Sequence, residues 1–230
     1  QLGMINSRFE NSAGMPAPQH YTTARDLATL TRALIHEFPQ YYPLYSLREF
    51  AFNGITQPNR NLLLGRDPTV DGVKTGHTES AGFCLVSSAL RDGMRLIAVV
   101  LGTTSENARA NESQTLLNYG FRFYETHRLY AANKPLSTTR VWKGEVDSLT
   151  LGLSKNLYIT IPRGQYKGLT ASMNIYPQIV APVAKGHTYG TVKVEMGGKE
   201  IAKQPLVALQ AIKEGGIWSR FVDWTLLLFE

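Results

Sequence analysis

Two apolar runs separated by a tight-turn signal constrain the fold of this chain more than any other feature. Phe-Cys-Leu-Val opens the segment 83–91, and Leu-Ile-Ala-Val-Val-Leu closes the segment 94–101. Asp92 and Gly93 lie between these segments, and an Asp-Gly pair is a strong signal for a two-residue β-hairpin turn. Because the runs are continuously apolar, both faces of the strands should be covered. The sequence therefore predicts an antiparallel hairpin with other elements packed on both sides.

Helical patterns lie before and after the predicted hairpin. Residues 23–38 repeat apolar side chains at helical intervals, and Thr23 and Asp26 have the spacing of a helix-capping pair. Residues 106 to about 124 are rich in helix formers and predict a second helix. The aromatic stretch 45–58 shows neither period and is predicted to be irregular.

The composition changes after about residue 126, where short β-rich runs separated by Gly, Pro and Asn replace the helical patterns. Several short strands at such spacing indicate a small β-sandwich or barrel. We therefore expect an α/β domain with an antiparallel sheet over residues 1–128 and a small all-β domain over residues 129–214. The predicted strands of the second domain are 139–143, 157–162, 169–175, 191–196 and 205–209.

Basic residues outnumber acidic ones, with 24 Lys and Arg against 18 Asp and Glu and a net charge of +6. Such a surplus favours an anionic partner such as nucleic acid, a membrane surface or an acidic polymer, although a basic solvated surface is the simpler explanation. The chain has no basic run with interleaved aromatic residues. We therefore expect no nucleic-acid partner.

The histidines and the cysteine indicate neither a metal site nor a disulfide. Cys84 is the only cysteine, which excludes an internal disulfide and a thiolate metal cluster. The histidines show no H-E-x-x-H or other ligand spacing. We therefore expect no metal and no cofactor. The five histidines are His20, His36, His77, His127 and His187.

Lys74, Thr75 and Gly76 directly precede the hairpin and form a candidate site motif. The lysine would supply a fixed positive charge, the threonine would offer a hydroxyl to a carboxylate, and the glycine would let a peptide lie close to the strand. The tripeptide alone is weak, because chance produces it often and a hairpin turn with a surface lysine explains it as well. Its context strengthens the signal, since His77 follows it and a buried strand comes next.

A longer series of sequence blocks gives the Lys-Thr-Gly motif a family context. The main blocks are 23–27, 52–55, 59–63, 70–78, 81–82, 120–126 and 161–164, with further matches at 2–4, 9, 11 and 14. Together they resemble the D-alanyl-D-alanine carboxypeptidases of the low-molecular-mass penicillin-binding protein family, of the penicillin-binding protein 5 and 6 type, over essentially all 230 residues. The resemblance implies a transpeptidase/β-lactamase-like α/β (α+β) domain, with the Lys-Thr-Gly motif on an edge strand, followed by a small all-β domain.

By this resemblance the protein is a serine-type peptidase that removes D-alanine from peptidoglycan stem pentapeptides through an acyl-enzyme and is also acylated by β-lactam antibiotics. The family uses S-x-x-K, S-x-N and K-T-G motifs, and no S-x-x-K occurs in this sequence. S-x-N occurs at 105–107 and 172–174, but both follow K-T-G, against the family order. We expect the two missing motifs upstream of Gln1, and residues 1–230 alone should be inactive.

The resemblance also assigns individual residues. Lys74, Thr75 and Gly76 are carried over as active-site residues, with Lys74 and Thr75 also binding substrate. His77 and Arg60 match substrate-binding positions, although His77 could be an ordinary strand residue and Arg60 could only hold a loop. Residues 103–105 stand where some relatives carry an arginine near the substrate carboxylate, and Arg109 lies nearby in the sequence but is not equivalent.

Three other functions remain open at this point. A non-catalytic envelope-binding protein could share the fold, and a sequence upstream of Gln1 without a serine–lysine motif would favour it. A β-lactamase shares K-T-G but does not need the β-rich second domain. A cysteine hydrolase would have to pair Cys84 with His77, yet Cys84 lies in an apolar strand where free cysteine is usually inert.

Residues 215–230 predict an amphipathic membrane-anchor segment. Two glycines precede a helix over residues 217–229 with a broad apolar arc that includes Trp218 and Trp224. The helix is too short to span a bilayer but suits the membrane interface. A helix docked on the protein's own β domain is the alternative. By resemblance, the expected location is the periplasmic face of the bacterial inner membrane.

Overall fold

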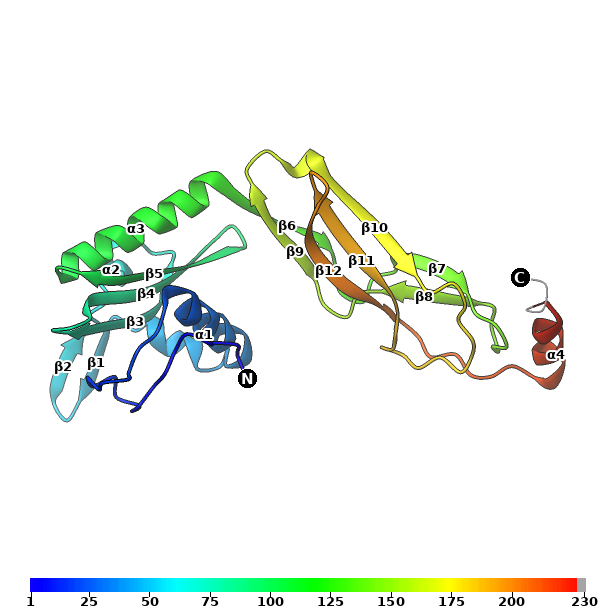
Figure 1. Ribbon diagram of the computed structural model, residues 1–230, viewed down its shortest axis with the longest axis horizontal. Helices are drawn as coiled ribbons and strands as arrows, with labels where there is room; N and C mark the ends of the chain where they lie inside the picture. The colour runs from blue at the N-terminus through cyan, green and yellow to red at the C-terminus, as the bar shows by residue number, and fades with distance from the viewer. Residues whose placement is uncertain (227–230) are drawn as a thin grey trace. The chain divides into compact units, whose positions relative to one another are not determined.

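The computed structural model describes residues 1–226 of the chain. Its contacts divide the chain between Tyr124 and Glu125 into two compact units, each with its own buried core (Figure 1). The division lies four residues before the boundary predicted at residue 128. The difference arises because β6 (Tyr124–Tyr130) pairs with β9 (Leu157–Pro162), a strand of the second unit.

The first unit is built on a three-stranded antiparallel sheet in the order β3-β4-β5. Its strands are β3 (Val70–Thr78), β4 (Gly82–Arg91) and β5 (Met94–Thr103). Asp92 and Gly93 form the β4–β5 turn with φ angles of +48° and +79°, the left-handed region that an Asp-Gly turn requires. The predicted hairpin is therefore confirmed.

Helices cover both faces of this sheet, as the apolar runs predicted. Alternate residues of a strand point to opposite faces, and in β4 Leu85 packs in the cluster of α3 (Glu106–Phe123), whereas Val86 packs toward α1 (Ala24–Glu37). Figure 1 shows α3 and α1 on opposite sides of the sheet. The α3-side cluster is Leu63, Leu64, Val70, Leu85, Ala89, Ala98, Ala110 and Leu117.

The start of α1 ties the N-terminal segment to the sheet unit. Thr23 caps the helix as predicted, with its hydroxyl accepting from the Asp26 amide at 3.2 Å. The buried Asp26 carboxylate does not accept a hydrogen bond from the Thr23 backbone amide, as it would in a capping box. It accepts instead from the Asn6 amide at 3.0 Å and the Ser7 hydroxyl at 2.7 Å.

The prediction that residues 45–58 are irregular is wrong for most of this stretch. A 3-10 turn, η1 (Tyr42–Ser46), is followed by a hairpin of β1 (Glu49–Phe52) and β2 (Ile55–Pro58). The short helix α2 (Leu63–Arg66) comes next. Every residue of the hairpin is exposed, so the sequence has no alternation between buried and exposed positions that would reveal these strands.

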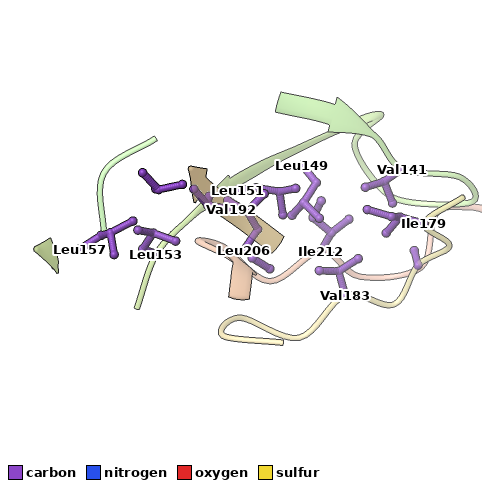
Figure 2. Close-up of a cluster of buried hydrophobic side chains, with 13 residues drawn as sticks. Val141, Leu149, Leu151, Leu153, Leu157, Ile179, Val183, Val192, Leu206 and Ile212 are labelled. Carbon is purple, nitrogen blue, oxygen red and sulfur yellow. The ribbon is translucent and has the colours of Figure 1, made fainter. Parts of the chain in front are cut away.

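The second unit contains a five-stranded antiparallel sheet, in the order β10-β11-β12-β8-β7, and the β6–β9 pair. Figure 2 shows its core of aliphatic side chains, including Leu149, Leu151 and Leu206. The predicted β-rich domain is confirmed, but β8 and β6 were missed. The strands and the remaining turn are β7 (Ser137–Arg140), β8 (Ser148–Gly152), β10 (Leu169–Ile175), β11 (Thr188–Met196), β12 (Lys199–Ala208) and η2 (Tyr166–Gly168).

The C-terminal helix α4 (Ile217–Leu226) belongs to the second unit. It matches the start of the helix predicted over 217–229, and Leu227, Leu228 and Phe229 lie outside the described residues. No helix among residues 1–226 is both long and apolar enough to cross a membrane.

Asp67 is the centre of a buried polar network that joins the end of α2 to β4 and α3. Its carboxylate contacts Arg91 at 2.6 Å, Thr69 at 2.6 Å and Gln114 at 3.0 Å. Burial acts to raise the pKa of Asp67, but the hydrogen bonds from Thr69, Gln114 and Arg91 outweigh it and lower that pKa to about 2. The ionised carboxylate therefore stabilises the first unit.

We expect Asp67→Asn to lower the free energy of unfolding by about 2 kcal/mol at pH 7. The folded-state pKa is lowered, so the stabilisation is present above about pH 4 and is lost as the pH falls toward 2. Calorimetry between pH 7 and pH 2 measures the free energy of unfolding of both proteins, and the difference between wild type and variant should become smaller as the pH falls. Asp92→Asn, at the exposed hairpin turn, is the matched control. A gap that stays constant with pH would contradict this account.

Candidate active site

Strand β3 carries the Lys-Thr-Gly motif at the edge of the sheet. Its register with β4 places Lys74 opposite Val86, Thr75 opposite Leu85 and Gly76 opposite Cys84. Within residues 1–226, β4 is the only strand that pairs with β3. Among the described residues, β3 is therefore an edge strand, which is where the resemblance places the Lys-Thr-Gly motif.

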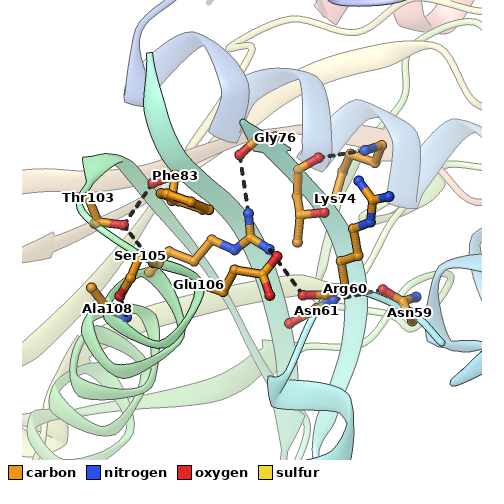
Figure 3. A network of polar contacts seen from close by, with 12 residues as sticks. Asn59, Arg60, Asn61, Lys74, Gly76, Phe83, Thr103, Ser105, Glu106 and Ala108 are labelled. Atoms are coloured by element: carbon orange, nitrogen blue, oxygen red, sulfur yellow. Dashed lines mark hydrogen bonds and ion pairs between the residues drawn. The ribbon is translucent and has the colours of Figure 1, made fainter. Parts of the chain in front are cut away.

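The open side of β3 lines a pocket of about 1070 Å³, and this pocket brings all five predicted site residues together. The pocket is a broad cleft whose walls also include Phe9, residues 11–14, Gln57, Asn59 and the start of α3. Figure 3 shows Arg60 and Lys74 extending on the same side of the strand. The five residues are Arg60, Lys74, Thr75, Gly76 and His77.

The motif side chains are accessible rather than packed in the core. Lys74 is exposed, and its Nζ donates to the Thr75 carbonyl. His77 is also exposed and stacks on Phe83, with ring centroids 3.9 Å apart. Both side chains can therefore meet a ligand without unfolding the strand.

The loop that carries Arg60 is anchored to β3 by its neighbour Asn61. The buried Asn61 amide donates to the Gly72 carbonyl at 3.0 Å, and its Oδ1 accepts from the Leu63 amide at 3.1 Å. Asn59 Oδ1 in turn accepts from the Asn61 backbone amide at 2.9 Å. These bonds hold the Arg60 backbone beside the strand while its side chain stays exposed.

Asp71 supports β3 from the α1 side of the sheet. Its carboxylate accepts from the Tyr42 hydroxyl at 2.8 Å and forms an ion pair with Arg95 at 2.7 Å. Burial raises the pKa of Tyr42 to about 12, and the Asp71 carboxylate adds to the effect. A Cβ at Gly72 would lie 2.9 Å from the Tyr42 hydroxyl oxygen, so only glycine allows this close approach.

Arg109 is the site residue that sequence reasoning set aside. Its side chain is only 2% exposed, yet it lines the pocket and donates to the carbonyls of Gly76 and Arg60, both at 3.3 Å. Arg109 also pairs with Glu106 at 3.0 Å. A signal was available, because Arg109 shares the buried face of α3 with Ser113 and Leu117 at helical spacing.

The charges around the pocket favour an anionic ligand. Arg60, Lys74 and Arg109 line it, whereas Glu106 is the only acidic residue among its lining residues. Among residues 1–226, no three His, Cys, Asp or Glu side chains come together in a way that could hold a metal ion. The arrangement can bind a carboxylate between the lysine, the threonine hydroxyl and the arginines.

Cys84 and His77 do not form a catalytic pair. The Cys84 thiol donates to the Ala81 carbonyl at 3.4 Å, and its sulfur accepts from the Gly102 amide at 3.5 Å. His77 stacks on Phe83 instead. The sulfur is therefore engaged by backbone groups, which gives a cysteine hydrolase no support.

Comparison with known proteins assigns the two units to known families. Residues 1–105 match the family model described as D-alanyl-D-alanine carboxypeptidase. Residues 124–214 match the model described as penicillin-binding protein 5, C-terminal domain. Both units of the chain are therefore similar to D-alanyl-D-alanine carboxypeptidases of the penicillin-binding protein 5 type. The resemblance inferred from the motif blocks is thereby confirmed, and so is the α/β domain followed by an all-β domain.

Similar proteins of this family come from several bacteria. The D-alanyl-D-alanine carboxypeptidase DacC of Escherichia coli K12 is 43% identical over 100% of this chain and 58% of that protein. DacF of Bacillus subtilis is 32% identical over 98% of this chain and 60% of that protein. The chain therefore spans about three fifths of the length of these curated relatives.

Crystal structures of penicillin binding protein 5 from Haemophilus influenzae give a TM-score of 0.83 at 39% identity. The match covers 93% of this chain and 63% of that one. The carboxypeptidase-family fold is thus shared across both units. The individual roles of Arg60, Lys74, Thr75, Gly76 and His77 remain predictions, which the pocket geometry supports.

Proposed function

We propose that the full-length protein is a serine-type D-alanyl-D-alanine carboxypeptidase that removes the terminal D-alanine from peptidoglycan stem pentapeptides. The observation that carries this proposal is the edge strand β3, whose Lys-Thr-Gly motif lines a cationic pocket. The similarity of the chain to D-alanyl-D-alanine carboxypeptidases supports it. The reaction needs a nucleophilic serine from an S-x-x-K motif, which residues 1–230 do not contain.

In the proposed reaction, the serine hydroxyl attacks the carbonyl carbon of the D-Ala-D-Ala peptide bond. The C–N bond breaks, and D-alanine leaves with the proton on its amine. Water then hydrolyses the ester of the acyl-enzyme and restores the serine hydroxyl. A β-lactam would acylate the same serine, and its opened ring would stay attached.

The residues of this chain would bind and orient the peptide. The open backbone edge of β3 would pair with the extended peptide, as sheet edges do with peptide ligands. Lys74 would place a fixed positive charge beside the reacting groups, and Thr75 would donate a hydroxyl hydrogen bond to the terminal carboxylate. Arg60 at the rim would attract the same carboxylate.

Lys74→Ala in the full-length protein should reduce the rate of acylation by a fluorescent penicillin by about a hundredfold or more. Removal of one preorganised electrostatic group commonly has an effect of this size. The fold should survive, because Lys74 is an exposed residue of an edge strand. The acylation rate is measured by quenching the labelling reaction at successive times and reading the labelled protein by gel fluorescence.

Lys185→Ala, an exposed lysine of the second unit, serves as the control and should be labelled at the wild-type rate. Normal labelling of a well-folded Lys74→Ala protein would remove the role assigned to Lys74. Failure of the wild-type protein to be labelled at all would favour a non-catalytic binding protein of this fold.

We further infer that α4 attaches the protein to the periplasmic face of the inner membrane. The buried Asp223 side chain accepts a hydrogen bond from the Lys143 amide and contacts Arg140 at 3.4 Å. The helix is thus held to the β domain through a polar side chain. Its exposed apolar side chains are Ile217, Trp218, Phe221, Val222, Trp224 and Leu226.

The distribution of charge supports an anionic surface as the partner of this helix. From residue 125 onward, the chain has 13 Lys and Arg against 8 Asp and Glu, so nearly all of the positive surplus belongs to the second unit. Exposed tryptophans suit the headgroup level of a bilayer. Lipid headgroups and basic side chains would then reinforce the apolar contact.

Replacing Trp218 and Trp224 by serine should release the full-length protein from liposomes that contain anionic lipid. Both side chains are more than half exposed, at 82% and 52%, so their loss removes apolar contact with lipid without opening the core. Co-sedimentation measures the bound fraction, which for the wild-type protein should fall as salt is raised. Tyr158→Ser, an exposed aromatic residue of β9, is the control. Equal binding by the double variant and the wild type would overturn the anchor proposal.

A further inference from the structure

We propose that Glu106 sets how strongly the pocket binds carboxylate ligands, because its negative charge partly neutralises the positive charge of Arg109. Glu106 is here a specificity-determining residue that acts through Arg109. The inference rests on the proposed function only in taking a peptide carboxylate as the ligand. Glu106 was not among the site residues predicted from the sequence.

The position of Glu106 places its charge at the pocket wall. Glu106 is the first residue of α3, directly after Ser105, which caps the helix by accepting from the Ala108 amide at 3.0 Å. The Glu106 side chain is 52% exposed and lines the pocket, and its Oε1 lies 3.0 Å from Arg109 NH2. Figure 3 shows the Glu106 carboxylate in the space between α3 and the strand that carries Gly76.

Arg109 couples this carboxylate to the ligand-binding strand. The guanidinium donates to the Gly76 carbonyl and to the Arg60 carbonyl, so its charge lies beside the backbone of two predicted site residues. A ligand carboxylate beside β3 is attracted by Arg109 and Lys74 and repelled by Glu106. Removing the Glu106 charge should therefore strengthen the attraction for a carboxylate and leave a neutral ligand unaffected.

A purely structural role for Glu106 makes a different prediction. An acidic residue in the first turn stabilises a helix through its dipole, and a counter-ion lowers the cost of the buried Arg109. Both effects would change stability or displace Arg109, and they would weaken the binding of charged and neutral ligands alike. A change that affects the binding of a charged ligand but not of a neutral one therefore distinguishes the electrostatic role of Glu106 from a purely structural role.

The experiment compares two ligands that differ in one charge, N-acetyl-D-alanyl-D-alanine and its C-terminal amide. Their dissociation constants are measured by NMR titration of the full-length protein at low ionic strength. Glu106→Gln removes the charge and keeps the side-chain shape. We expect the carboxylate ligand to bind about two- to fivefold more tightly to this variant, the range for a partly exposed ion pair, and the amide to bind as before.

Two variants serve as controls. Glu106→Asp keeps the charge and should keep the wild-type ratio of the two dissociation constants. Glu112→Gln removes an exposed charge from the same helix outside the pocket lining and should also leave the ratio unchanged. Added salt should reduce the gain seen in Glu106→Gln. If glutamine prevents folding, Glu106→Ser provides a second neutral replacement that suits the first turn of a helix.

An unchanged ratio in a folded neutral variant would overturn the inference, as would equal shifts for both ligands. Equal binding of the two ligands to the wild type and to every neutral variant would overturn it as well. Penicillin labelling of the wild type is measured separately. A protein that is not labelled but shows the expected ratio would lose the proposed function while keeping the role of Glu106.

Discussion

The contacts of the Arg109 guanidinium join the parts that form the candidate active site. The side chain comes from α3, yet its donors bind carbonyls of the motif strand and of the Arg60 loop. A buried arginine must keep its partners, because leaving such a charge unpaired costs about 3–5 kcal/mol. The requirement works in both directions, since satisfying Arg109 also fixes the spacing between the strand and the loop. Two further contacts hold the same strand. The Asn61 side chain donates to a carbonyl of β3, and Asp71 of β3 bonds Tyr42 and Arg95.

The second unit uses a similar device at its C-terminal helix. Asp223 is buried against the backbone of Lys143 and next to Arg140, which holds one side of α4 to the β domain. The apolar side chains of the helix remain exposed. In both units, a charged side chain that bonds backbone groups far away in the sequence orients a surface for which we propose a binding role. The apolar core alone would not specify either orientation, because packing of aliphatic side chains is not directional.

The sequence predicts elements well where burial is periodic. The β4–β5 hairpin, α1 and α3 all follow from apolar runs, capping residues and a turn signal. The β1–β2 hairpin was missed because none of its residues is buried. β8 was missed although Leu149 and Leu151 alternate with polar residues and are fully buried, a period-two pattern typical of a strand. Arg109 was missed for another reason. Its helical spacing with buried residues of α3 indicates that Arg109 is buried, but its partners Gly76 and Arg60 lie 33 and 49 positions away, and the spacing does not reveal these contacts. The motif residues were recognised from their residue types and context, and the family resemblance strengthened that assignment.

The most direct test of this account is a crystal structure of the full-length protein acylated by a penicillin. The bound acyl group should lie along the open edge of β3, with its carboxylate within hydrogen-bonding distance of the Thr75 hydroxyl. Arg109 should still bond the carbonyls of Gly76 and Arg60 in that complex. An adduct placed away from β3, or one that forms with Arg109 withdrawn from both carbonyls, would contradict the claim that this strand and its anchoring arginine form the ligand site.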